Sequence, residues 1–202
     1  MDKFLKQYRN PINVNNKNKI LVEDETLLLI VDVQQKLIKN IKDNQQLIFN
    51  IKKLIDTCNL LNVRVAITEQ NPLKLGKTLE SITDNIEYPK FEKMEFSCIN
   101  NMNFIKYIND YNFKNIIVSG IESHICVLQT SMDLLQKGLN ILIPRDAIGS
   151  RNKMDNDTAF LRLILSGAVA STTESLICEL CKTSNRKEFR EVSKILKNSF
   201  SN

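Results

Sequence analysis

The 202-residue sequence has no tryptophan, a single histidine and no long apolar run. The longest uninterrupted apolar stretch, Leu27–Val31, has five residues, whereas a membrane-spanning helix needs about 20. The N-terminal stretch also lacks the apolar core of a secretory signal peptide. From these absences we expect a cytoplasmic protein with no membrane partner.

A basic groove for nucleic acid is also lacking. The formal net charge of +5 comes from the two ends: residues 1–20 carry five cations and one anion, and residues 182–202 carry six cations and two anions. A nucleic-acid groove would instead place its cations on the folded body, beside aromatic side chains. We interpret the charged ends as solvated, with a polyanion site as the alternative, and expect no nucleic-acid partner.

The five cysteines do not indicate a disulfide scaffold. Their odd number and the length of the chain indicate free thiols in a reducing compartment. Cys178 and Cys181 are spaced as a redox or metal pair would be, but they lie in an apolar helical pattern. A zinc site needs four ligands, and the chain has no second pair of this spacing. We therefore interpret both as buried helix cysteines and expect no metal site.

Short apolar runs alternate with longer helical patterns along the chain. We predict strands at 27–32, 63–68, 115–119, 139–143 and 167–171, and helices at 42–60, 101–111, 124–137, 154–166, 173–182 and 187–198. Continuous apolar strands that alternate with helices indicate parallel crossovers. The sequence predicts a doubly wound α/β domain over residues 26–202, with a mostly parallel sheet flanked by helices on both faces. Residues 1–25 are predicted to form an N-terminal arm.

In such a sheet the ligand site lies beyond the carboxyl ends of the strands. Asp32 stands at the end of the first predicted strand, Glu69 and Gln70 follow the second, and the segment 120–126 follows the third. These positions should converge on one rim, although Asp32 could also be an ordinary strand-end carboxylate. No glycine-rich phosphate-binding loop follows the first strand.

Cys126 is the candidate nucleophile on this rim. A helical pattern begins here with Ser123 as a plausible N-cap, which would place Cys126 at the third helical position. Near the positive end of a helix dipole the pKa of a thiol falls; the alternative is a buried helix cysteine. His124 would point elsewhere on the helix and is a poor general base for it. Spacing alone does not distinguish Lys93 from Lys90.

An ordered set of motifs resembles the isochorismatase-like cysteine hydrolase superfamily, and within it the isochorismatase domain-containing proteins. The motifs are Leu29-Ile-Val-Asp-Val-Gln34, Thr68-Glu-Gln70, Leu75-Gly76, Lys93-x-x-Phe-Ser97 and Gly120-Ile-Glu-Ser-His-Ile-Cys-Val127. They continue with Gln129-Thr130, Gly138, Asp146-Ala147, Ser150-Arg151, Ser166-Gly-Ala168 and Thr172-Thr-Glu-Ser175. The resemblance covers residues 27 to 198.

This resemblance implies roles for individual residues. It implies a catalytic triad of Asp32, Lys93 and Cys126, and it selects Lys93 over the neighbouring lysine. It also implies a cis peptide bond between Ile121 and Glu122, with the backbone N–H groups of Glu122 and Cys126 forming an oxyanion hole. The implied candidate substrate contacts are Gln34, Gln70 and Phe96. No cofactor is implied, and the partners would be a small-molecule substrate and further copies of the chain, in a dimer or larger homo-oligomer.

The sequence differs from members of the superfamily in three respects that bear on its expected chemistry. Nicotinamidases bind a metal through one aspartate and two histidines after the second strand, which a chain whose only histidine is His124 cannot reproduce. True isochorismatases lack the cysteine, so Cys126 favours attack on a carbonyl-like carbon. Asn71 replaces an aromatic residue that is frequent in close relatives.

We therefore expect a cysteine hydrolase that cleaves a small amide or a related C–N compound through a thioester. One alternative is a non-catalytic, oligomeric binding or scaffold protein that retains the fold. Another is a redox protein that uses Cys126, for which Cys98 is the nearby candidate for a resolving cysteine.

Overall fold

The computed structural model describes residues 21–200. Residues 1–20 of the predicted arm lie outside this range. Leu21 is fully buried, and its N–H donates to Glu179 Oε1 at 3.2 Å. Glu23–Glu25 form a 3-10 turn that leads into the first strand. Residues 21–25, which the sequence assigns to the arm, therefore pack onto the domain.

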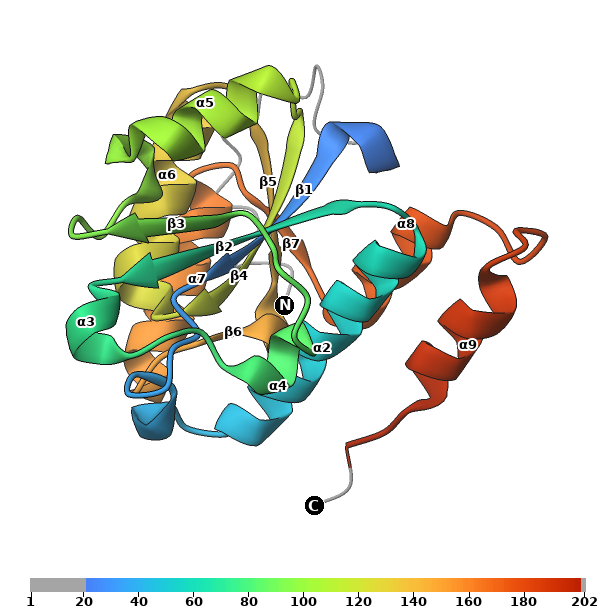
Figure 1. The fold of residues 1–202 in the computed structure, drawn as a ribbon, viewed down its shortest axis with the longest axis horizontal. Helices are drawn as coiled ribbons and strands as arrows, with labels where there is room; N and C mark the ends of the chain where they lie inside the picture. Colours follow the sequence, from blue (N-terminus) through green and yellow to red (C-terminus); the bar gives the residue numbers. More distant parts are fainter. Residues whose placement is uncertain (1–20, 201–202) are drawn as a thin grey trace, which may run out of the picture.

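A seven-stranded sheet, parallel at every pairing, forms the centre of the molecule (Figure 1). Its strands are β1 (Thr26–Val31), β2 (Arg64–Gln70), β3 (Lys90–Lys93), β4 (Asn115–Ile121), β5 (Asn140–Pro144), β6 (Ile148–Gly149) and β7 (Val169–Ser171). Their order is β3-β2-β1-β4-β5-β7, with β6 paired to β4. The chain thus builds outward in one direction from β1 and in the other from β4. The gap between the ends of β1 and β4 is the switch point at which such sheets bind ligands.

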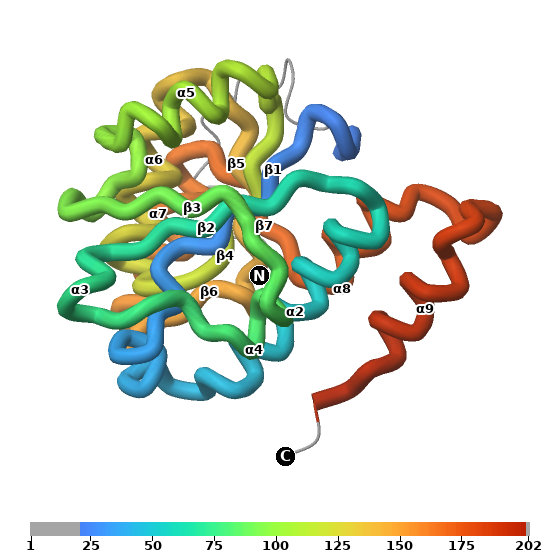
Figure 2. Tube along the Cα trace, viewed as in Figure 1, coloured from blue at the N-terminus to red at the C-terminus, as the bar shows by residue number. Residues whose placement is uncertain are grey.

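Helices cover both faces of the sheet (Figures 1 and 2), which confirms the predicted fold class. They are α2 (Asn44–Leu60), α3 (Pro72–Leu75), α4 (Glu80–Thr83), α5 (Met102–Asp110), α6 (Leu128–Gln136), α7 (Lys153–Leu165), α8 (Thr173–Cys181) and α9 (Phe189–Lys197). Short 3-10 helices lie at Ile38–Asn40, Cys98–Asn100 and Arg145–Ala147, and a π-helical turn lies at Ser123–Val127. Within residues 21–200, none of the helices is both long enough and apolar enough to span a bilayer.

The alternation of β1 side chains divides the interior into two apolar clusters. Leu28 and Ile30 face α2, α8 and α9, where they pack in one cluster with residues such as Ile51. Leu27 and Leu29 face α5, α6 and α7 and belong to the second cluster. All six β1 residues are buried. A strand buried on both faces explains the uninterrupted apolar run in the sequence.

Gly120 allows β1 and β4 to end side by side. It pairs with Val31 in the parallel register and has a φ of +118°. A Cβ atom at this position would lie 2.2 Å from the backbone oxygen of Val31, a distance that no side chain tolerates. Only glycine therefore fits, and the residues that follow the two strands are brought close together.

One expectation about the cysteines needs correction. All five are free, as predicted, but Cys178 is exposed on α8 while its neighbour Cys181 is buried. The helical spacing places position 178 on the outer side of α8, so only one of the pair belongs to the core.

Candidate active site

Asp32 and Lys93 form a buried ion pair at the switch point. Lys93 Nζ lies 2.6 Å from Asp32 Oδ2, and each side chain is 1% exposed. Thr68 Oγ1 donates to the other carboxylate oxygen at 2.7 Å. Burial alone would lower the pKa of Lys93, but Asp32 and the nearby thiols of Cys126 and Cys98 outweigh it, so the pKa lies above its usual value. The lysine is therefore held as a cation.

Cys126 lies against this pair, as the sequence predicts. It is 6% exposed, and its thiol interacts electrostatically with both Asp32 and Lys93. Burial, and then the negative charge of Asp32, raise the pKa of this thiol well above its usual value, while Lys93 opposes the rise. The lowered pKa expected from the helix dipole is thus wrong in sign: desolvation and a neighbouring carboxylate exceed the effect of the helix end.

The backbone before Cys126 also differs from the predicted helix start. The residues Ser123–Val127 form a π-helical turn in which Glu122 occupies the N-cap position and Cys126 is the fourth residue. Ser123 does not cap this turn; its buried Oγ has no partner among the described residues. The Ile121–Glu122 peptide bond is cis, in agreement with the expectation. The Glu122 carboxylate accepts from the backbone N and from Nε of Arg151, both at 3.1 Å.

Two of the three candidate substrate contacts are engaged within the protein. Gln70 Oε1 accepts from Lys93 Nζ at 2.9 Å, and its Nε2 donates to the Met94 oxygen at 2.6 Å. Gln34 is fully buried: its Nε2 donates to the backbone oxygens of Gln70 and Gly76, and its Oε1 accepts from the Gln70 N–H. Gln34 therefore holds backbone instead of presenting its amide to a ligand. Phe96 is half exposed beyond the end of β3, at the rim.

Glu69, the penultimate residue of β2, does not join the ion pair of Asp32 and Lys93. Its Oε1 accepts from the N–H and the Oγ1 of Thr78, both at 2.7 Å, and lies 3.3 Å from Lys90 Nζ. The carboxylate is 2% exposed. It thereby ties residues 71–78 to β2, next to the segment that Gln34 holds.

His124 is directed away from the thiol. Its Nδ1 lies 3.0 Å from Ser150 Oγ, and its Nε2 lies 3.9 Å from Asp155 Oδ2. Both partners come from the segment that follows β6. A general-base role toward Cys126 has no support in these contacts, as the sequence indicates.

Cys98, which the sequence offers only as a candidate resolving thiol in the redox alternative, lies at the site. Its sulfur accepts from Thr130 Oγ1 at 3.3 Å. Burial raises its pKa to about 11, against the opposing effect of Lys93. Sequence reasoning missed the contacts of Thr68 and Thr130; the signal available for Thr68 was its place near the carboxyl end of β2, next to β1.

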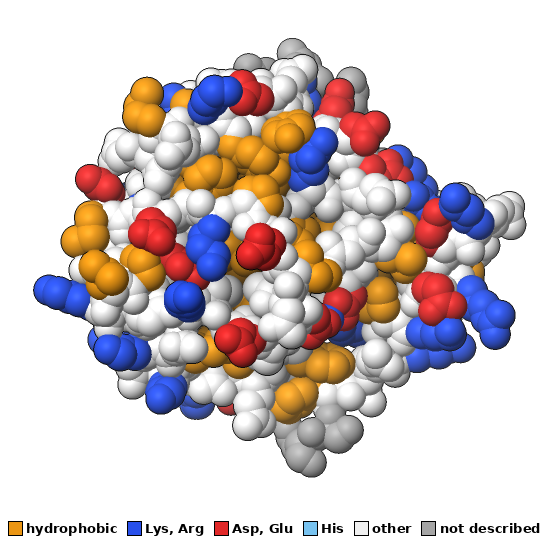
Figure 3. All heavy atoms as spheres, in the orientation of Figure 1, with side chains coloured by type: hydrophobic (Ala, Val, Ile, Leu, Met, Phe, Trp, Pro, Cys, Tyr) orange, Lys and Arg blue, Asp and Glu red, His pale blue; other side chains and the backbone are white. Residues whose placement is uncertain are grey.

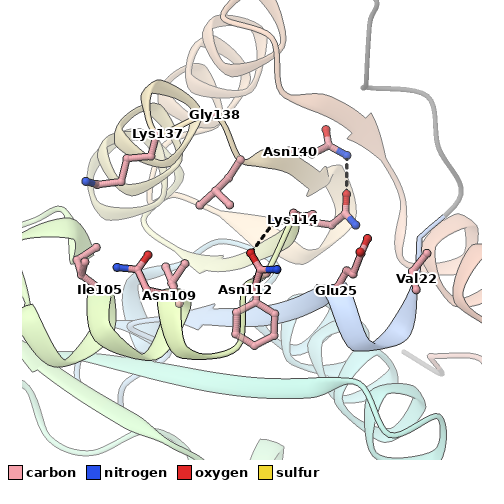
Figure 4. Close-up of a pocket in the computed structure, with 13 residues that line it drawn as sticks. Val22, Glu25, Ile105, Asn109, Asn112, Lys114, Lys137, Gly138 and Asn140 are labelled. Atoms are coloured by element: carbon pink, nitrogen blue, oxygen red, sulfur yellow. Dashed lines mark hydrogen bonds between the residues drawn. The ribbon is translucent and has the colours of Figure 1, made fainter.

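One hollow of the molecule adjoins Lys93, and another lies away from the site. A pocket of about 640 Å³ opens at the amino ends of β1, β4 and β5, the opposite edge of the sheet (Figure 4). The side chains of Asn109, Lys114 and Asn140 surround it. Among residues 21–200, no group of three or more histidine, cysteine, aspartate or glutamate side chains is placed to hold a metal ion.

The chain is similar to several known proteins. The chain is 34% identical over 183 residues to isochorismatase family protein 1B of Dictyostelium discoideum, covering 88% of each chain. A solved structure described as MAR1 ribonuclease from Caenorhabditis elegans superposes with a TM-score of 0.85 at 32% identity, covering 91% of this chain and 95% of that one. The YcaC gene product of Escherichia coli, described as an octameric hydrolase of unknown specificity, has a TM-score of 0.79. At 19% identity, with 87% and 88% of the two chains covered, it shows the fold alone.

The family model of the isochorismatase domain matches residues 26–175 and includes Asp32, Lys93 and Cys126. The similarity to isochorismatase domain-containing proteins, predicted from the motifs, is confirmed. The chain belongs to the isochorismatase family.

Proposed function

We propose that the protein is a cysteine hydrolase that cleaves a small amide or a related C–N compound through a thioester, with Asp32, Lys93 and Cys126 as its catalytic triad. The observation that carries the proposal is the buried 2.6 Å ion pair of Lys93 and Asp32 beside the Cys126 thiol. A nucleophile with a base and a cation in contact is the arrangement that covalent hydrolysis requires.

The first step is attack by sulfur on the substrate carbonyl. Asp32 takes the proton of the Cys126 thiol as the S–C bond forms, and the Lys93 ammonium stabilises the sulfur while it is anionic. The carbonyl π electrons move to oxygen. The backbone N–H groups of Glu122 and Cys126 are proposed to bind this oxyanion, and removal of such a donor costs about 3–4 kcal/mol in transition-state stabilisation.

The second step breaks the C–N bond. The oxyanion collapses, Asp32 returns its proton to the leaving nitrogen, and an amine departs from a Cys126 thioester. Water, deprotonated by Asp32, then attacks the thioester carbonyl and releases the acid and the thiol. Every proton passes through Asp32, so no cofactor takes part in this proposal; turnover should survive dialysis against a strong chelator.

The charge around the rim favours a small substrate that is not a polyanion. A hollow of about 450 Å³ beside Lys93 is lined by Glu92 and Glu95 among its charged residues. The charge of Lys93 itself is balanced by Asp32. Some solved relatives are described as ribonucleases, so RNA belongs among the compounds tested, but these carboxylates would repel a phosphate backbone.

We also propose a homo-oligomer and a cytoplasmic location, the latter supported by five free thiols. Exposed apolar side chains gather near the rim: Leu73, Met94 and Met102 are 98%, 66% and 78% exposed. Figure 3 shows apolar side chains standing out over α3 and the end of β3. Such side chains are typical of an interface. A single 23.3 kDa species in sedimentation at micromolar concentration would contradict the oligomer.

The test is a panel of small amides, ureas, hydroxamates and RNA, assayed with the wild type and with Cys126→Ala. We expect hydrolysis of at least one C–N compound by the wild type and none by the variant. Cys58→Ala, which removes a buried thiol from the other apolar cluster, is the matched control and should retain activity. Binding without turnover across the panel would favour a scaffold protein that retains the fold.

A further inference from the structure

We propose that Cys98 is a resolving thiol: it condenses with a sulfenic acid that a hydroperoxide forms on Cys126, and the two cysteines close a disulfide. This inference rests on the nucleophilic role proposed for Cys126, but it does not depend on the hydrolysis of any C–N bond.

The contacts of Cys98 place its sulfur against the helical turn that carries Cys126. Thr130 Oγ1 donates to Cys98 Sγ at 3.3 Å and accepts from the Cys98 backbone N–H at 3.1 Å. Thr130 follows Cys126 by four residues along one continuous helical segment. In an α-helix, side chains at this separation lie on one face with Cβ atoms about 5–6 Å apart, and four residues also span roughly one turn where the π-helical turn continues into α6. The Cys98 sulfur therefore lies within about one helical turn of the nucleophile.

Electrostatic interactions connect Cys98 to the other half of the site. The charges of Lys93 and Asp32 act on both thiols, and Cys98 acts on Cys126. Thr68 Oγ1, which donates to Asp32 Oδ1 at 2.7 Å, lies on the strand next to β1. Cys98 and Cys126 thus border the same ion pair and pack in the same apolar cluster.

Cys58 shows what a merely structural cysteine looks like in this protein. It is fully buried in the opposite cluster, and burial alone raises its pKa. Cys98 is equally buried, yet the Thr130 hydroxyl donates to its sulfur and the charge of Lys93 acts on it. A sulfenic acid condenses with a neighbouring thiol to form a disulfide.

The proposed steps balance with a hydroperoxide as the oxidant. Asp32 accepts the Cys126 proton, the sulfur attacks the terminal oxygen of the hydroperoxide, and the O–O bond breaks. The proton leaves with the departing oxygen as an alcohol or water, and Cys126 is a sulfenic acid. The Cys98 sulfur then attacks the Cys126 sulfur, the S–O bond breaks, and the hydroxide takes the Cys98 proton and leaves as water. Cys126 and Cys98 together lose two electrons, which the peroxide gains.

Closing the bond requires Cys98 to leave Thr130. A disulfide needs a sulfur–sulfur distance of about 2.05 Å and Cα atoms about 4.4–6.8 Å apart. Cys98 begins a three-residue 3-10 helix in the connection between β3 and α5, so a short segment is all that has to adjust. The product would block the nucleophile and would reopen with a dithiol.

Peptide mapping after hydrogen peroxide treatment tests the proposal without any substrate. Trypsin releases Cys98 in the peptide 94–106 and Cys126 in the peptide 115–137, each with a single cysteine. We expect these two peptides linked in the oxidised wild type and separated by dithiothreitol. In Cys98→Ala the linked species should be lost, and Cys126 should proceed to the irreversible sulfinic acid. Cys58→Ala is the matched control and should form the link as the wild type does.

The outcome that overturns the proposal is equal sulfinic acid formation on Cys126 in the wild type and Cys98→Ala, with no linked peptide in either. Thermal unfolding of Cys98→Ala checks that it folds; Cys98→Ser, which keeps a polar group toward Thr130, is the second variant and should also form no link. If the link forms while the panel shows no hydrolysis, the redox chemistry stands and the proposed hydrolase does not. If hydrolysis occurs and no link forms, the reverse holds.

Discussion

Opposite effects of Asp32 and Lys93 on the Cys126 thiol offer the sharpest test of the proposed triad. After burial, the charge of Asp32 is the largest cause of the raised pKa of this thiol, and Lys93 acts against it. Asp32→Asn should therefore lower the pKa of Cys126, and Lys93→Met should raise it further. Both substitutions keep the approximate shape of the side chain they replace, so packing changes little.

The size of the effect follows from Coulomb's law. As a reference, two unit charges about 4 Å apart interact by about 4 kcal/mol at an effective dielectric constant of 20. Since about 1.4 kcal/mol corresponds to one pKa unit, the ionisation of the thiol could move by up to about 3 pH units. A lower pKa increases the fraction of thiolate at neutral pH, but each thiolate is then a weaker nucleophile. On a logarithmic scale, this loss of nucleophilicity offsets roughly half of the increase in rate. We expect Asp32→Asn to be alkylated about 3-fold to 30-fold faster than the wild type at neutral pH.

The assay is the rate of iodoacetamide labelling of the peptide 115–137, followed by mass spectrometry between pH 7 and 10. Lys93→Met should label more slowly than the wild type, and Asp32→Asn should be inactive in hydrolysis although its thiol ionises more easily. Asp157→Asn is the control, because that carboxylate is 42% exposed and pairs with Lys153 of α7 and with Arg145 of the 3-10 helix that follows β5. Slower labelling of Asp32→Asn, or shifts of the same sign in both variants, would refute the reasoning. Circular dichroism shows whether each variant is folded.

Three further predictions concern the residues that support the site. Gly120→Ala should lower the free energy of unfolding by at least about 3 kcal/mol, because its Cβ would meet the Val31 oxygen. Gly138→Ala is the control: no atom lies within 4 Å of its added Cβ, and its positive φ alone should cost about 1 kcal/mol. Equal losses of stability in urea unfolding of the two variants would contradict the prediction. Gln70→Leu removes a hydrogen bond to the Lys93 ammonium and should lower kcat about tenfold, with little change in Tm; an unchanged kcat on the best panel substrate would exclude it as a positioning residue. Glu69→Gln should lower the free energy of unfolding by about 1–3 kcal/mol in the same assay, because a buried carboxylate that faces three donors becomes neutral. An unchanged unfolding midpoint would show that Glu69 does not stabilise the segment 71–78.

Four of the five strands that the sequence predicts are largely buried on both faces; the fifth, predicted at 167–171, is β7, whose three residues are half-buried or exposed. The strands β1, β2, β4 and β5 read as apolar runs because helices cover both of their sides. By contrast, β3 was missed, since Lys90–Lys93 forms an edge strand in which two of four residues are exposed. The two residues of β6 are too few for any periodicity. Lys93 could not be selected by pattern for the same reason: it lies on the strand that was not recognised.

Some features of the site could be predicted from the sequence and others could not. Asp32 and Cys126 could be predicted because position after a strand is a sequence property, and the switch point brings those positions together. The direction of the Cys126 pKa shift could not be predicted, because it depends on how deeply the thiol is buried and on which charges the fold brings next to it. Thr68 and Cys98 lie on other segments, and only the paired register of β1 with β2 and the contact with α6 reveal them.

A thiol with a raised pKa can still be the nucleophile of a buried site. The pKa measures loss of a proton to bulk water, which here would add a negative charge to a desolvated cluster beside Asp32. Transfer of the same proton from Cys126 to Asp32 only moves one negative charge from oxygen to sulfur, and the net charge of Asp32, Lys93 and Cys126 is unchanged. The cost of burying an additional charge therefore does not arise in that step. Lys93, held 2.6 Å from the carboxylate and in electrostatic contact with the thiol, stabilises the negative charge at either position. The arrangement thus keeps the sulfur protonated and unreactive toward solvent until a substrate, or a peroxide, accepts its electrons.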